Sequence, residues 1–123
     1  MEKKKITSFR DLIVWQRSLD FVTKVYSITQ TFPKEEIYGL TSQIRRAAVS
    51  IPSNVAEDQS RGSDGVFANH IDISIGSSAE LETQLTIALN IKYLELSDYD
   101  SLITELIQIT RMLYGLRAKL RSR

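Results

Sequence analysis

The sequence predicts an all-α protein, folded as an antiparallel, up-down-up-down four-helix bundle in a single domain over residues 1–123. Four stretches of the chain repeat apolar residues at spacings of three and four, the periodicity of a helix with one buried face. The 123 residues include only five Gly and two Pro, too few for an all-β domain with a turn about every ten residues. Short connections between the four stretches favour helices that alternate in direction.

The first helix is expected over residues 12–32, where two apolar stripes follow the helical period about 120° apart. One stripe consists of Leu12, Trp15, Leu19, Val22 and Tyr26, and the other of Val14, Phe21, Val25, Ile28 and Phe32. Pro33 is expected to close the helix, because a residue before proline is pushed out of helical geometry. The two stripes together cover more of the circumference than one packing seam needs.

The second helix is expected after a connection at residues 34–40, with Thr41 as its N-cap. Its apolar pattern runs from Ile44 to Val55, and Pro52 lies inside it. Proline lacks a backbone donor and crowds the carbonyl four residues earlier, so the second helix is predicted to kink at Pro52. The alternative is that the segment splits into two helices there.

The third helix follows the clearest break in the chain, residues 59–65, and Ser63 is its expected N-cap. Its seam alternates spacings of four and three through Phe67, Ile71, Ser74, Ser78, Leu81, Leu85 and Ala88. The middle of this helix, around Gly76, is small and polar, which suggests that a neighbouring backbone packs tightly there.

The fourth helix is expected to begin at Ser97, with acidic residues in its first turn that complement the helix dipole. Its seam repeats without a miss through Leu102, Leu106, Ile109, Leu113, Leu116 and Leu120. That period favours small crossing angles in a bundle. A second apolar stripe lies off the seam and contains Ile103, Ile107 and Tyr114.

The surplus apolar stripes of the first and fourth helices predict self-association, because exposed stripes of that size usually mark contacts with a partner. The expected oligomer-interface residues are Val14, Phe21, Val25, Ile28, Ile103, Ile107 and Tyr114.

Charge is segregated along the chain although the net charge is only +1. Residues 1–10 and 111–123 hold nine of the 16 basic residues and a single acidic one. An antiparallel bundle places both termini at one end, together with the loop that contains Arg61. The predicted nucleic-acid-binding residues are Lys3, Lys4, Lys5, Arg10, Arg61, Arg111, Arg117, Lys119, Arg121 and Arg123, with residues 1–8 forming a flexible basic arm. The other interpretation is that these charges offset helix dipoles and aid solubility.

No catalytic constellation, metal site or cofactor site is predicted. The chain lacks Cys, and the single His70 has no Glu-x-x-His partner of the kind found in metal-binding bundles. No apolar run approaches a membrane span, and the basic N-terminus lacks the apolar segment of a signal peptide, so a cytoplasmic location is expected.

Four charged residues lie in otherwise apolar or small-residue stretches of the second and third helices, where buried charges need partners. These structural ion-pair candidates are Arg45, Arg46, Glu80 and Glu82, and the expected pair is Arg46 with Glu80. Solvated helix faces are the alternative.

Three motifs resemble a known family. They span residues 9–16 (FRDLIVWQ), 39–57 (GLTSQIRRAAVSIPSNVAE) and 76–83 (GSSAELET). The chain resembles the four-helix-bundle proteins encoded within bacterial 23S ribosomal RNA intervening sequences, over about residues 9–120. It departs from the family pattern at Asp58, Val66 and His70. The resemblance implies a homopentameric ring without known catalytic activity, and kinship with accessory proteins of diversity-generating retroelements, whose basic barrels bind nucleic acid and a reverse transcriptase.

The function that these observations predict is a non-enzymatic, homopentameric protein that binds RNA or another nucleic acid through clustered Lys and Arg. Several copies would multiply weak phosphate contacts into useful avidity. The alternative is a protein-interaction scaffold, or an accessory subunit, that docks an acidic partner or a reverse transcriptase. An RNA-processing enzyme is a third option for which the sequence offers no catalytic group set.

Overall fold

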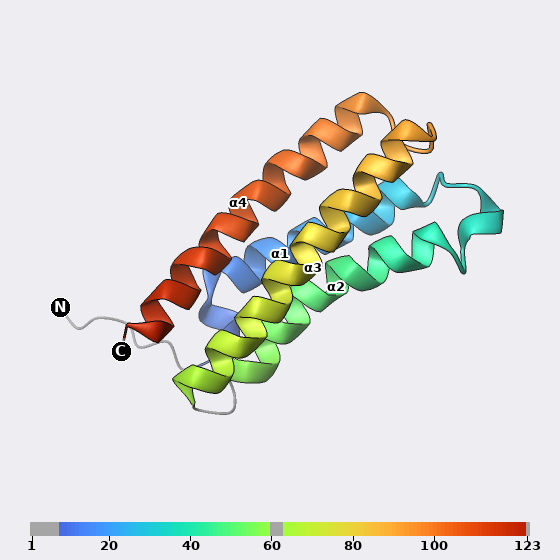
Figure 1. The fold of residues 1–123 in the computed structure, drawn as a ribbon. Helices are drawn as coiled ribbons and strands as arrows, with labels where there is room; N and C mark the ends of the chain where they lie inside the picture. Colours follow the sequence, from blue (N-terminus) through green and yellow to red (C-terminus); the bar gives the residue numbers. More distant parts are fainter. Residues whose placement is uncertain (1–7, 60–62, 123) are drawn as a thin grey trace.

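Four helices form because each amphipathic stretch buries one face against its neighbours. In the computed structural model, which describes residues 8–59 and 63–122, the helices pack side by side along most of their length (Figure 1). Two short 3-10 helices accompany them. The elements are η1 (Phe9–Asp11), α1 (Ile13–Thr29), η2 (Lys34–Glu36), α2 (Leu40–Gln59), α3 (Asp64–Asn90) and α4 (Leu96–Arg121). The described residues contain no strand, which agrees with the predicted all-α class.

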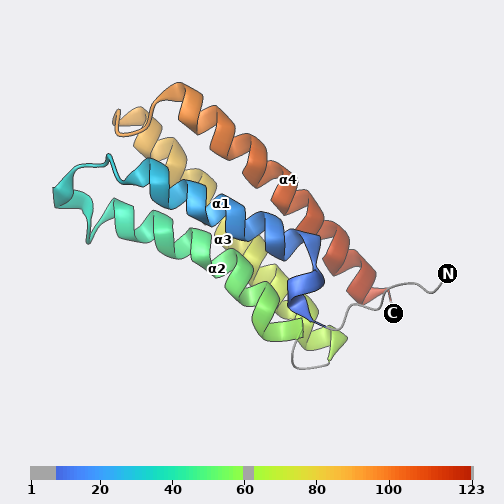
Figure 2. The same cartoon turned by 180° about the vertical axis from the view of Figure 1, so that it is seen from behind.

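The four helices surround one hydrophobic core. Each helix packs against the next in the chain, and α1 also packs against α4. Figures 1 and 2 show the α1–α2 and α3–α4 connections at one end of the bundle. The start of α1, the end of α2, the start of α3 and the end of α4 lie at the other end, so successive helices run in opposite directions.

The helix bounds differ from the predicted ones in small ways. Helix α1 ends at Thr29, several residues before Pro33, and α4 begins at Leu96, one residue before Ser97. Ser63 is the N-cap of α3, as predicted, and its hydroxyl accepts a hydrogen bond from the Val66 amide at 3.4 Å. Thr41 was the wrong cap for α2, because the helix already begins at Leu40 and the Thr41 side chain is buried.

Helix α2 continues through Pro52 to Gln59. The alternative of two separate helices is therefore wrong, whereas the kink at Pro52 stays a prediction. Ser74 from α3 packs against this region and donates a hydrogen bond to the carbonyl of Ile51 at 2.9 Å.

The core corrects the predicted role of one α1 stripe. Val14, Phe21 and Val25 are buried inside the bundle, together with Ser18 and Thr29, so these three apolar residues are not available to another copy. The two hydroxyls bond to carbonyls of their own helix, at 2.6 Å from Ser18 to Val14 and 2.7 Å from Thr29 to Val25. Hydroxyls that are satisfied locally can be buried at little cost, which allows this stripe to face inward.

The seams of α3 and α4 match the predicted ones closely. The α3 seam is buried throughout, and in α4 only Leu116 is partly exposed. The expected tight packing at Gly76 is wrong, because a Cβ placed there would have no neighbour within 4 Å. The close contact between α2 and α3 is made instead by Ser77, whose hydroxyl lies 2.8 Å from that of Ser50.

Candidate nucleic-acid interface

Two of the predicted basic residues meet an acidic residue from the neighbouring helix. Arg117 and Arg121 are one helical turn apart on α4, so their side chains project from the same face. Arg117 Nη1 lies 2.7 Å from Asp72 Oδ1, and Arg121 Nη2 lies 2.5 Å from Asp72 Oδ2. Each oxygen of the α3 carboxylate therefore accepts a hydrogen bond from a different guanidinium. We call this arrangement the arginine fork.

The fork lowers the pKa of Asp72 below its ordinary value of 3.8. The hydrogen bond from Arg117 is the largest cause, desolvation opposes it, and the positive charges of Arg121 and Arg117 add to the lowering. The carboxylate is therefore ionised at neutral pH, and one negative charge is held between two positive ones. The side chains remain open to water, because Asp72 is 37% exposed, Arg117 28% and Arg121 52%.

An exposed aromatic ring adjoins the fork. The guanidinium carbon of Arg117 lies 4.8 Å from the ring centroid of Tyr114, and this tyrosine is 47% exposed. Arg10 makes a similar contact with Phe9 at 4.6 Å, and Phe9 in turn packs edge-on against Trp15. Proteins that bind single-stranded nucleic acids use this combination, because the aromatic ring stacks on a base and the cation contacts a phosphate.

The structure describes five of the ten predicted nucleic-acid-binding residues. Two of them, Arg111 and Lys119, are exposed on α4, and the other three make the contacts given above. The remaining five lie outside the described residues, and they are Lys3, Lys4, Lys5, Arg61 and Arg123. Figure 1 places the end of α4 and the start of α1 at the same end of the bundle.

Acidic residues also lie at the end of the bundle that contains the start of α1 and the end of α4. This end is therefore less basic than the charges of residues 1–10 and 111–123 alone indicate. The last turn of α2 contains Glu57, and the first turn of α3 begins with Asp64. Asp11 lies in η1, and each of these three residues has an interaction partner. With Asp72 in the fork, Arg111 and Lys119 are the two predicted nucleic-acid-binding residues, among the five that the structure describes, whose side chains make no hydrogen bond or ion pair.

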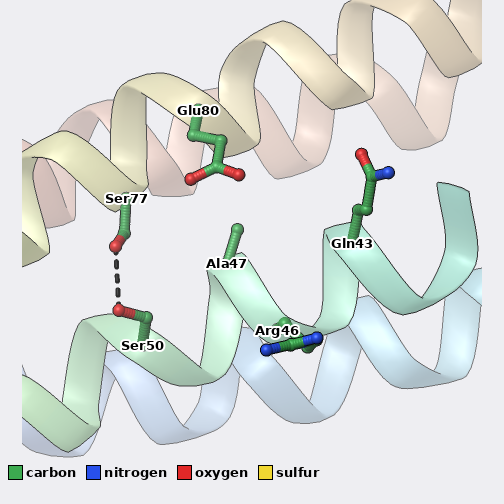
Figure 3. Close-up of a pocket in the computed structure, with 6 residues that line it drawn as sticks. All are labelled: Gln43, Arg46, Ala47, Ser50, Ser77 and Glu80. Carbon is green, nitrogen blue, oxygen red and sulfur yellow. Dashed lines mark hydrogen bonds between the residues drawn. The ribbon is translucent and has the colours of Figure 1, made fainter.

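The predicted ion pair between Arg46 and Glu80 is wrong. No ion pair joins them within the described residues, and both side chains are exposed. They line one shallow hollow between α2 and α3, of about 380 Å³, in which Figure 3 shows the Arg46 guanidinium turned away from the Glu80 carboxylate. Glu80 accepts a hydrogen bond from Gln84 of its own helix at 3.2 Å. Glu82 is exposed too, so the solvated-face alternative describes these three side chains.

Arg45 has a structural contact that the sequence did not suggest. Its Nε donates to Thr29 Oγ1 at 2.9 Å, its Nη2 donates to the Tyr26 carbonyl at 3.3 Å, and its guanidinium stacks on the Tyr26 ring at 4.6 Å. The last turn of α1 contains no basic residue of its own. Arg45 therefore supplies the positive charge that favours the carbonyl end of that helix.

The apolar surface of α1 is formed by the stripe that was not assigned to the interface. Trp15, Leu19 and Val22 line a groove of about 300 Å³ against Val49 and Pro52 of α2. Of the predicted interface residues, Ile107 and Tyr114 are exposed on α4, while Ile28 and Ile103 are partly buried against the core. Apolar surface is thus present on both predicted helices, although on α1 the residues differ.

Neither a metal site nor a membrane span is found in residues 8–59 and 63–122. No three or more His, Cys, Asp or Glu side chains there gather in a way that could hold a metal ion. No helix in the same residues is both long and apolar enough to cross a bilayer. His70 contacts Asn54 of α2, with Nδ1 3.0 Å from Oδ1.

Comparison with known proteins places these features in a family. Residues 10–115 match the family model described as 23S rRNA-intervening sequence protein. A solved structure from Bacteroides thetaiotaomicron is similar in fold, and is described as a protein with unknown function from the S23 ribosomal protein family. Its TM-score is 0.80 at 22% sequence identity, over 86% of this chain and 96% of the other. No curated protein matches the chain.

Proposed function

Because the chain belongs to the 23S rRNA-intervening sequence protein family, we propose that it is a non-catalytic, cytoplasmic, homo-oligomeric protein that binds RNA. The observation that carries the proposal is the cluster of arginines beside an exposed tyrosine at the end of α4. Guanidinium groups bind phosphate oxygens in pairs of hydrogen bonds, and an aromatic ring next to them can stack on a base.

The cations without an acidic partner are the first candidates for contacts with RNA phosphates. Arg111 and Lys119 lie on exposed positions of α4 and are free to neutralise phosphates. Such contacts release counterions, so binding weakens as salt rises. Few cations per copy give weak binding, and several copies in one assembly raise it through avidity.

The assembly is a ring, and the resemblance to the family implies five copies. Two different apolar surfaces support such an arrangement. The groove formed by α1 and α2 lies on one side of the bundle, and the stripe with Ile107 and Tyr114 lies on the α3–α4 side. When one surface of a copy packs against a different surface of the next, the copies close into a ring if the rotation allows it.

The test of RNA binding uses charge reversal in the unpaired cations. We expect R111E/K119E to weaken binding of a single-stranded RNA oligonucleotide and to reduce the steepness of log K against log salt by about two, since two phosphate contacts are lost. K34E/K92E is the matched control, because it makes the same charge change in η2 and in the α3–α4 connection. Figure 1 shows the α1–α2 and α3–α4 connections at the opposite end of the bundle from the end of α4. Equal losses in both variants, or binding that is indifferent to salt, would contradict the proposal.

The test of assembly is the mass in solution. We expect light scattering to give a multiple of the 14.0 kDa chain, and L19E in the α1–α2 groove to return it to the monomer. A monomer at all concentrations would exclude the ring.

The second candidate is a scaffold that docks a protein, such as an acidic partner or a reverse transcriptase. The α1–α2 groove favours it, because Trp15 is the kind of residue that anchors protein interfaces. A scaffold of this kind predicts that R111E/K119E leaves weak RNA binding unchanged, while W15A abolishes capture of the partner.

A further inference from the structure

The arginine fork has the geometry of an occupied anion site. Two guanidiniums from adjacent turns of α4 each bind one oxygen of the same carboxylate, at 2.7 and 2.5 Å. The carboxylate belongs to α3, whereas both arginines belong to α4. A phosphodiester also presents two oxygens that share one negative charge, and arginine recognises both groups in the same bidentate manner.

The carboxylate is held where a solvent anion could replace it. All three side chains are partly open to water, so screening weakens their attraction, and an exposed pair of this kind contributes little to stability. A replacing phosphate would keep the number of hydrogen bonds to the guanidiniums unchanged. The exchange therefore needs no rearrangement of the helices.

The surroundings of the fork leave room for a nucleotide. Tyr114 covers one side of the Arg117 guanidinium and remains 47% exposed. The next residue, Gly115, has open space around its Cα, and Ala118 on the same face carries only a methyl group. Among the described residues, none of these side chains bars a base that follows a phosphate in the fork from reaching the tyrosine ring.

We propose that Arg117 and Arg121 form a phosphodiester subsite for single-stranded RNA, and that Asp72 occupies this subsite in the free protein. The proposal rests on the proposed RNA-binding function and deepens it. Asp72 acts as an internal competitor that lowers the affinity for isolated anions. A polynucleotide displaces it because the neighbouring phosphates are held by other cations at the same time.

The experiment compares RNA affinities by fluorescence anisotropy, with a labelled single-stranded oligonucleotide and a salt series. D72N keeps the shape of the side chain and removes its charge, so we expect binding to tighten by about threefold to tenfold and the salt slope to steepen by about one. The control is E82Q, which removes the same charge from an exposed position on α3 about 15 Å further along the helix. We expect E82Q to change the affinity by less than about twofold, since a Debye length at physiological salt is about 8 Å.

A second pair of variants separates the fork from the overall charge. In the R117Q/R121Q background, D72N should no longer tighten RNA binding, because the two guanidiniums for which Asp72 competes with RNA are absent. Equal effects of D72N and E82Q, or a D72N effect that persists without the arginines, would overturn the proposal.

The subsite is also tested without RNA. Dimethyl phosphate is titrated into the protein while the Nε–Hε resonances of Arg117 and Arg121 are followed by NMR, and we expect shifts at lower concentration in D72N than in the unmodified chain. Arginine resonances that do not move in D72N overturn the subsite, whatever the RNA result. If they move but no variant binds RNA, the anion subsite stands and the proposed function fails.

Discussion

Gly76 offers a sharp test of how the outer face of α3 behaves. It lies in the middle of a 27-residue helix, it is exposed, and a Cβ added there meets nothing within 4 Å. Glycine in a helix interior costs about 1 kcal/mol relative to alanine, because it loses more backbone freedom on folding. Since no clash offsets this gain, G76A should raise the free energy of unfolding by about 0.8–1 kcal/mol, or the melting temperature by roughly 3–5 °C.

The assay is urea denaturation followed by circular dichroism, at protein concentrations where the chain is a monomer. Ala79 is the matched control, because it is exposed on the same helix one turn later. A79G should lower the free energy of unfolding by a similar amount. A G76A variant that is no more stable than the unmodified monomer would refute the reasoning, since it would show that the isolated bundle packs something against this position.

The remaining predictions concern the core, the helix ends and the fork. F21A should destabilise the bundle by about 3–5 kcal/mol when monomers are unfolded in urea, because Phe21 is buried, whereas L19A should cost less than about 1 kcal/mol, because Leu19 is 40% exposed. Equal losses would contradict the inward position of the Phe21 stripe. S63A should cost about 0.5–1 kcal/mol, since the cap of α3 is lost, and a loss of zero would mean that water replaces it. K92G should stabilise the chain by up to about 1 kcal/mol in the same assay, because Lys92 has a φ of 67° at the end of α3, where glycine carries no strain. The stabilisation from Asp72 is present above its unfolded pKa of 3.8 and is lost as pH falls through its lower folded pKa, so a pH series of melting temperatures should show a smaller acid loss for D72N.

The number of helices and their approximate bounds were predictable because they rest on local signals. Residues at spacings of three and four mark the α3 and α4 seams, and all of them except Leu116 are buried. Ser63 could be predicted as a cap because a hydroxyl just before a helical stretch can accept a hydrogen bond from the free amides of the first turn. These signals need no knowledge of the neighbouring helix.

The inward face of α1 was not predictable in the same way, because both of its stripes are apolar. The buried stripe also contains Ser18 and Thr29, two polar residues that are buried with it. Their hydroxyls bond within the helix, so they cost little when buried. An i, i+4 carbonyl is available to any helical serine or threonine, and this signal could have identified the stripe.

The arginine fork was missed because its members are 45 and 49 residues apart in sequence. Arg117 and Arg121 could be placed on one face of α4, and Asp72 beside the α3 seam, from spacing alone. The register between α3 and α4 decides whether they meet, and that register depends on the packing of both seams. The Arg46–Glu80 pair failed for the related reason that burial on α2 and α3 had been inferred from neighbours in sequence.

Tyr114 links the two proposed properties of the protein. It is an exposed apolar residue on the α4 stripe, and it stacks on the Arg117 guanidinium that holds Asp72. In the proposed assembly, a neighbouring copy packed over Tyr114 would restrict the Arg117 side chain and would cover the ring on which a base could stack. The proposed assembly and the proposed RNA binding would therefore act on the same groups. Free-energy linkage then requires that each changes the other by the same factor. If both proposals hold, RNA binding and ring formation would be coupled through Tyr114 and Arg117. The sign of the coupling would depend on whether the packed tyrosine holds Arg117 toward Asp72 or away from it.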